Sequence, residues 1–257
     1  MEKWKALDEL IKGASVIDLS PRIEHGMPKW PTHPMVIVDA TVTQEHDGYF
    51  CQTLVMGEHT GAHVDAPAHV VRGMTEWTID RFPADILIGP AIHYDLSRFD
   101  PQPGERITID QIRQLEEEMG DHCREGDIVL LDFGWQKYWT CGPDWIFYGK
   151  NQPGLDEETC RLFAERGVKA VGADTVACDT PVKDGFEYES FGHYKYWLPN
   201  KIFIMEMLMN LNQLPDRCYF IATPLFIKGG SGSPIRPVAI VIVSRNLESA
   251  GQDSSAG

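Results

Sequence analysis

A short stretch of this chain concentrates residues of the types that bind metal ions. His59, His63, Asp65 and His69 lie within the eleven-residue run H-T-G-A-H-V-D-A-P-A-H. Imidazole nitrogens and carboxylate oxygens are the usual nitrogen and oxygen ligands of zinc and similar divalent ions. Four such side chains at this density predict a metal centre. The alternative is a polar turn whose histidines only form hydrogen bonds.

The backbone of this run is predicted to be extended or looped rather than helical. Pro67 disfavours the α region at the residue before it, and Gly61 weakens a helix. Side chains two positions apart on an extended segment point to the same face. We therefore expect His63 and Asp65 to point toward one metal ion together.

A second candidate for metal binding is an acid inside an apolar run. Glu206 lies within I-F-I-M-E-M-L at residues 202–208, and His193 precedes it by thirteen residues. A carboxylate is costly to bury as a charge without a partner. The residues alone leave two partners open, a metal ion or a buried lysine or arginine.

The histidine motif resembles that of the metal-dependent cyclase-like hydrolases, a family that includes bacterial kynurenine formamidase, isatin hydrolase and a trans-dienelactone hydrolase. The resemblance covers about residues 16–243, with D-L-S at 18–20, G-M-P at 26–28 and G-S-G-S-P-I-R at 230–236. One departure is Ala62, where the family usually has a threonine that is not a ligand. This departure concerns local packing more than metal binding.

The resemblance implies the roles of the candidate residues. The metal ligands that it implies are His59, His63, Asp65, His193 and Glu206. The last two would complete a second metal position, with Asp65 or Glu206 bridging. His69 matches the family's proton shuttle, and an imidazole pKa near 6.5 suits that task.

The function implied by the resemblance is hydrolysis of an amide by water on Zn²⁺ or Mn²⁺, with one or two ions per subunit. We expect a small planar substrate, either an N-formyl arylamine such as N-formylkynurenine or a cyclic amide such as isatin. Relatives of the isatin hydrolase type lack the counterpart of Glu206, so its presence favours a formamidase-like site. The alternative is a lactone hydrolase of the trans-dienelactone type on the same metal site.

Aromatic residues outside the motif are candidates for binding the ring of the substrate. Trp30 lies in a long loop at residues 21–34, and Phe50 begins an expected strand. We expect both to contact the substrate, and the loop at 134–153 to cover the site. Packing of Trp30 against the loop prolines is the alternative. The aromatic candidates of the covering loop are Trp135, Tyr138 and Trp139.

Two other classes of protein are compatible with some of these residues. A non-haem iron oxygenase would use His63, Asp65 and a distant histidine such as His193 as a facial triad. The remaining donors would then lack roles. A metal-binding protein without catalytic activity would hold the ion without turnover, and the intact His69 argues against it. We therefore favour the hydrolase.

Composition excludes several partners. The 257 residues carry a net charge of −15, and such a chain repels nucleic acid and anionic membranes. No apolar run approaches the ~20 residues of a membrane span, and the start, M-E-K-W-K-A-L-D-E-L, lacks the apolar stretch of a signal peptide. We expect a cytoplasmic protein with reduced cysteines. The resemblance adds a homo-oligomer, either a dimer or a tetramer.

The order of the predicted elements indicates a mixed α/β fold. Amphipathic helices are expected at 109–119 and 156–166, and buried strands at 127–133 and 168–173. The resemblance implies a single swivelling β/β/α domain of the cyclase-like type with a barrel-like β core over residues 1–250. A polar tail at 251–257 is expected to be flexible.

Overall fold

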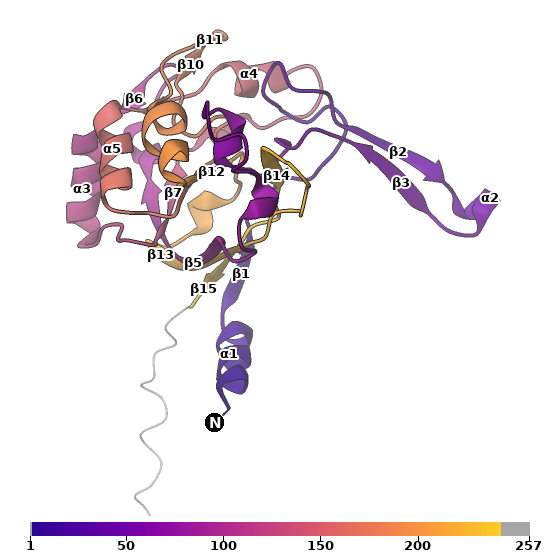
Figure 1. Ribbon diagram of the computed structural model, residues 1–257, viewed down its shortest axis with the longest axis horizontal. Coiled ribbons are helices and arrows are strands. Elements are labelled where there is room, and N and C mark those ends of the chain that lie inside the picture. Colours follow the sequence, from indigo (N-terminus) through magenta and orange to yellow (C-terminus); the bar gives the residue numbers. More distant parts are fainter. Residues whose placement is uncertain (1, 243–257) are drawn as a thin grey trace, which may run out of the picture.

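A curled nine-stranded sheet forms the body of the molecule in the computed structural model, which describes residues 2–242 (Figure 1). The strand order is β1-β15-β13-β5-β7-β9-β12-β4-β14. The strands are β1 (Ser15–Asp18), β4 (His63–Asp65), β5 (Leu87–Asp95), β7 (Ile128–Asp132), β9 (Ala170–Ala173), β12 (Phe203–Glu206), β13 (Arg217–Ala222), β14 (Gly232–Pro234) and β15 (Val238–Val241). The expected mixed α/β fold with a barrel-like β core is confirmed. The expected tail at 251–257 lies outside the described residues.

Four neighbouring strands of this sheet, β5, β7, β9 and β12, run parallel. Their carboxyl ends therefore meet at one edge, which is where open α/β sheets bind ligands. Glu206 is the last residue of β12, and the antiparallel strand β4 places His63 directly opposite it in the register. The sheet thus brings together two candidate ligands that are 143 residues apart in the chain.

Two helices flank the parallel strands, α3 (Ile109–Met119) and α5 (Glu157–Glu165) (Figure 1). A capping box between Thr108 and Gln111 starts α3, and this helix has the bounds expected from the sequence. Its buried residues Ile112 and Leu115 join the main core cluster with the buried face of α5. Both helices thereby stiffen the strands that carry the site. Across residues 2–242, none of the helices has the length and apolar content needed to cross a membrane.

Smaller elements surround this body. The other α-helices are α1 (Lys3–Lys12), α2 (Gln44–Asp47) and α4 (Trp145–Lys150). The two-stranded sheets are β2 (Ile37–Val42) with β3 (Cys51–Val55), β6 (Arg106–Ile107) with β8 (Gly154–Leu155), and β10 (Val182–Lys183) with β11 (Phe186–Glu187). The β2–β3 hairpin, with α2 at its tip, extends away from the body, and we call it the arm (Figure 1).

The loop at 134–153 was expected to cover the site, but its residues do not line the cavity there. Trp135 is buried in the main core cluster, and Tyr138 and Trp139 pack against that cluster. Residues 145–150 of this segment form α4. The aromatic residues there stabilise the interior instead of contacting a substrate.

Candidate metal centre

The extended backbone predicted for the histidine motif is confirmed by β4. His63 and Asp65 lie on the same face of this strand, with 3.5 Å between Nε2 and Oδ1. The Nδ1–H of His63 donates to the carbonyl oxygen of Gly61 at 2.8 Å. That hydrogen bond leaves Nε2 as the free nitrogen, which faces Oε2 of Glu206 at 3.3 Å.

His193 reaches the same point from a π-helical turn at Gly192–Tyr196. Its Nε2 lies 3.5 Å from Oδ2 of Asp65 and 3.3 Å from Oε1 of Glu206. Its Nδ1 is hydrogen-bonded to Oδ1 of Asp179, whose other oxygen accepts from the backbone N–H of Gly192 at 2.6 Å. Asp179 therefore orients His193. Asp179 thus holds both the backbone of the turn and the imidazole ring.

Glu206 lies between the two imidazoles and is 5% exposed. Its Oε1 accepts from the backbone N–H of Cys178 at 3.0 Å. Within residues 2–242, its ion-pair partners are His63 and His193, and neither lysine nor arginine pairs with it. The alternative of a buried basic partner for Glu206 is therefore wrong.

His59 is held through both of its ring nitrogens. Nδ1 is 2.6 Å from Oδ1 of Asp65, and Nε2 is 2.9 Å from the Ser231 hydroxyl. Ser231 in turn donates to Glu58 through its backbone N–H at 2.7 Å and its hydroxyl at 2.8 Å. A Cβ at Gly232 would lie 2.5 Å from the His59 ring, so the glycine permits this close approach. The sequence did not identify Glu58 and Ser231 as part of the site.

The donor atoms at this site fit a divalent metal ion. Two groups have donor atoms that all lie within 4.8 Å of one another, namely His59 with Asp65 and His69, and His63 with Asp65 and Glu206. Asp65 is 1% exposed, and its Oδ2 is a buried oxygen without a hydrogen-bond partner in the described residues. A bound cation would satisfy that oxygen. The first group includes His69, so the geometry allows His69 to be a ligand as well as a proton shuttle.

Burial and neighbouring charges shift the pKa values of Asp65, Glu206 and His69 away from their usual ranges. Burial opposes ionisation of Asp65, but His59 and His69 hold its pKa well below the usual range. Burial and Asp65 also oppose ionisation of Glu206, while His193 and His63 lower its pKa overall. Burial lowers the pKa of His69 to about 4. His69 is therefore neutral at pH 7 and able to accept a proton.

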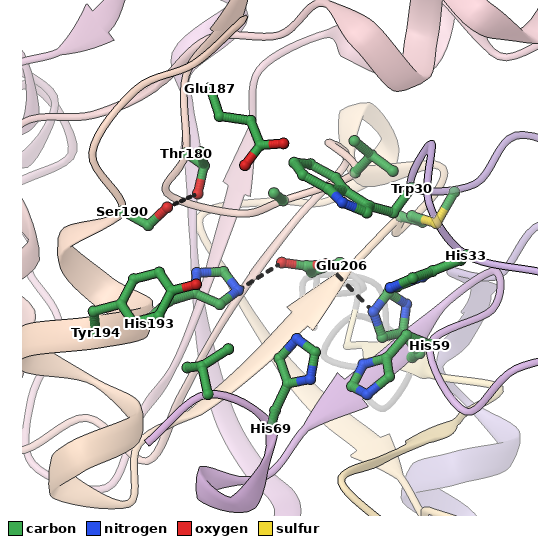
Figure 2. Close-up of a pocket in the computed structure, with 15 residues that line it drawn as sticks. Trp30, His33, His59, His69, Thr180, Glu187, Ser190, His193, Tyr194 and Glu206 are labelled. Atoms are coloured by element: carbon green, nitrogen blue, oxygen red, sulfur yellow. Dashed lines mark hydrogen bonds and ion pairs between the residues drawn. The ribbon is translucent and has the colours of Figure 1, made fainter. Parts of the chain in front are cut away.

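A cavity of about 230 Å³ opens onto these residues. Figure 2 shows His59, His69, His193 and Glu206 converging on it. Trp30 lines the cavity, as expected. Phe50 does not line it, because this side chain belongs to the arm and is 57% exposed. Lining residues that the sequence did not single out include His33, Thr180, Glu187, Ser190 and Tyr194.

A curled mixed sheet with a buried histidine and carboxylate centre at an open cavity defines a metal-dependent hydrolase of the cyclase-like fold. The chain belongs to the cyclase family, described as "Putative cyclase", whose model matches residues 17–180. This family confirms the resemblance noted in the sequence. The match includes the whole histidine motif and ends before His193 and Glu206.

Relatives of known activity are similar over most of the chain. The isatin hydrolase of Roseibium aggregatum is 28% identical over 237 residues, which are 88% of this chain and 86% of that protein. The kynurenine formamidase of Salinibacter ruber is 27% identical over 228 residues, or 87% of this chain and 96% of that protein. Both relatives are amide hydrolases, in agreement with the function implied by the motif.

Solved structures agree with this assignment. An isatin hydrolase bound to the product analogue thioisatinate superposes with a TM-score of 0.83 at 25% identity, covering 94% of this chain and 99% of that one. A protein described as a potential metal-dependent hydrolase with cyclase activity gives a TM-score of 0.67 at 25% identity, covering 89% and 98%. Metal dependence is thus a described property of a structural neighbour, and the donor atoms here are suited to it.

Proposed function

We propose that this protein hydrolyses the C–N bond of a small aromatic or cyclic carbonyl compound, either an N-formyl arylamine such as N-formylkynurenine or a cyclic amide such as isatin. One observation carries the proposal. Buried donors from β4, β12 and the His193 turn converge at a cavity that is also lined by Trp30. The names of the relatives supply both substrate types.

The proposed metal ligands are those that the family resemblance implies, namely His59, His63, Asp65, His193 and Glu206, and the proposed ion is Zn²⁺ or Mn²⁺. His63 and His193 would each use Nε2, because their Nδ1 atoms bond to Gly61 and Asp179. A bound divalent ion lowers the pKa of water to about 7 and polarises a carbonyl. That chemistry serves a linear amide, a cyclic amide or a lactone equally well, so the shape and charge of the cavity must select the substrate.

His69 is the proposed proton shuttle. It lines the cavity beside His59, with 4.0 Å between the ring centroids. Its neutral imidazole would take the proton released when water attacks the carbonyl carbon. The same proton would then pass to the leaving nitrogen, so that the amine departs uncharged and His69 returns to its starting form.

A substrate panel tests the proposed reaction. The purified protein is assayed with N-formylkynurenine, isatin, dihydropyrimidine-type cyclic amides and dienelactones, each with added Zn²⁺ and with added Mn²⁺. We expect turnover of at least one amide and loss of that turnover after chelation of the metal. A preference for a lactone of more than about a hundredfold would replace C–N cleavage by ester cleavage.

A further inference from the structure

We propose that Glu187 forms a subsite for a positively charged amino group, carried on the part of the substrate farthest from the scissile bond. The catalytic part of this inference rests on the proposed amide hydrolysis. It narrows the substrate class to amides that carry an amine, as opposed to a neutral or acidic group, at the end of the molecule away from the metal ligands.

The position of Glu187 supports this role. It is the last residue of β11, in the two-stranded β10–β11 sheet, and it lines the same cavity as His193 and Glu206. Figure 2 shows its carboxylate turned toward the interior of the cavity, at the end opposite His69. The nearby hydroxyls of Thr180 and Ser190 bond to one another at 2.6 Å. Glu187 is thus placed to meet a ligand at the outer end of the cavity.

The charge of the cavity indicates what that ligand would be. Among the described residues, the lining contains two carboxylates, Glu187 and Glu206, and it contains neither lysine nor arginine. Glu206 is already engaged by His63 and His193. Glu187 is therefore the lining carboxylate that is available to a ligand.

An amine suits this environment better than an acid does. None of the ion pairs among the described residues involves the Glu187 carboxylate. A substrate ammonium would form a charge-assisted hydrogen bond there, whereas a substrate carboxylate would meet like charge. The net charge of −15 also attracts cations toward the protein and repels anions.

Three matched substrates test the subsite. They share an ortho-formamidophenyl ring and differ in the second substituent, which is a ketone chain ending in a primary ammonium, an uncharged methyl ketone, or a carboxylate. We expect Glu187→Gln to lower kcat/KM for the ammonium substrate roughly tenfold. The methyl ketone should change by less than about twofold, and the carboxylate should be unchanged or improved. Glu189→Gln is the matched control, because Glu189 is exposed on the same segment and does not line the cavity.

A binding measurement separates this inference from the proposed reaction. Calorimetry is done with the arylamine that deformylation of the ammonium substrate would release, which keeps the ammonium group. Its Kd should be roughly tenfold higher for Glu187→Gln than for the wild type, whether or not the protein cleaves formamides. Equal affinity in the two proteins would overturn the subsite. An equal loss of kcat/KM on all three substrates would also overturn it, because it would indicate a structural role for Glu187.

Discussion

Each of two proposed histidine ligands is held by a hydrogen bond at the nitrogen that does not face the site. The carbonyl of Gly61 accepts from Nδ1 of His63, and the carboxylate of Asp179 engages Nδ1 of His193. Such bonds fix the tautomer and the orientation of the ring, and a carboxylate partner also raises the basicity of the ligand nitrogen. The partner of His193 is a charged carboxylate and the partner of His63 is a neutral carbonyl, so we expect them to contribute unequally to metal affinity.

Replacing Asp179 should weaken metal binding without removing a ligand. In an asparagine, one of the two oxygens becomes an amide NH₂. That group would face either the His193 ring or the backbone N–H groups of residues 192 and 193, which donate to Oδ2 of Asp179. Loss of such a partner typically costs 10–100-fold in metal affinity. Titration of Asp179→Asn with Zn²⁺ against a competing chelator measures this, with Asp144→Asn, an exposed position whose side chain forms no cap hydrogen bond, as the control. Wild-type affinity in Asp179→Asn would show that Asp179 acts only on the backbone.

The two roles open to His69 predict different results for His69→Ala. A proton shuttle accounts for about 10²–10⁴-fold in turnover, so the variant should keep its metal and lose most of its activity. Elemental analysis of the purified variant, together with kcat on the best amide of the panel, makes the distinction. If the metal disappears with the activity, His69 is a ligand alongside His59 and Asp65.

The motif residues could be predicted because their chemistry is local in sequence. His63 and Asp65 share a face of one strand, and strand geometry alone requires this. The contacts of Asp179 and Ser231 could not be predicted in the same way. Ser231 meets His59 across 172 residues of sequence, and no spacing rule links a serine in a glycine-rich turn to a distant histidine. Glu187 was missed because it gives no signal other than an exposed acid in a polar segment.

At the scale of elements, the parallel strands were the most predictable part. Hydrophobic strands at 127–133 and 168–173 were expected, and the structure has them at 128–132 and 170–173. The pairing of β4 with β12 was not predictable from pattern, because β4 has only three residues. The aromatic residues at 135–139 were misplaced for a different reason. Tryptophan and tyrosine suit a buried core as well as a binding pocket.

Arg217 links β13 by charged hydrogen bonds to the segment between α3 and β7. Its guanidinium donates to both oxygens of Asp121, at 2.7 and 3.2 Å, and to Asp127 at 2.6 Å. We expect Arg217→Met to cost about 1.5–3 kcal/mol of the free energy of unfolding, since hydrogen bonds to charged groups contribute on that order. Urea unfolding at pH 7 measures it. Arg161→Met is the control, because the exposed pairs of Arg161 at 3.7 and 3.8 Å should contribute little.

The same contact should weaken in acid. Hydrogen bonding from Arg217 holds the pKa of Asp121 well below its usual range. A carboxyl whose pKa is lower in the folded state stabilises the protein above its unfolded pKa of about 4 and loses that contribution as the pH falls below it. The difference in stability between wild type and Arg217→Met should therefore be constant above about pH 5 and narrow below about pH 4. A difference that stayed constant into acid would mean that packing, not charge, accounts for the effect.

At the scale of the whole molecule, the arm exposes apolar side chains that no other part of the described chain covers. All five residues of β3 are exposed, including Leu54 and Val55, which are 54% and 52% exposed. Ile37, which pairs with Val55 across the hairpin, is 45% exposed. An isolated two-stranded hairpin is at best marginally stable in water. Exposed apolar side chains gathered on one element in this way are typical of a surface that contacts another protein.

We propose that a second copy of the chain covers the arm, in keeping with the homo-oligomer expected from the family resemblance. Light scattering after size exclusion should then give a dimer or a tetramer for the wild type. A charge in an apolar contact is costly to desolvate, so Leu54→Glu should shift the protein toward the monomer. Gln52→Glu adds the same charge on the same face of β3 at a polar position, and it should shift the equilibrium less. A monomeric wild type at micromolar concentration, or an unchanged mass for Leu54→Glu, would rule out the arm as the interface between copies.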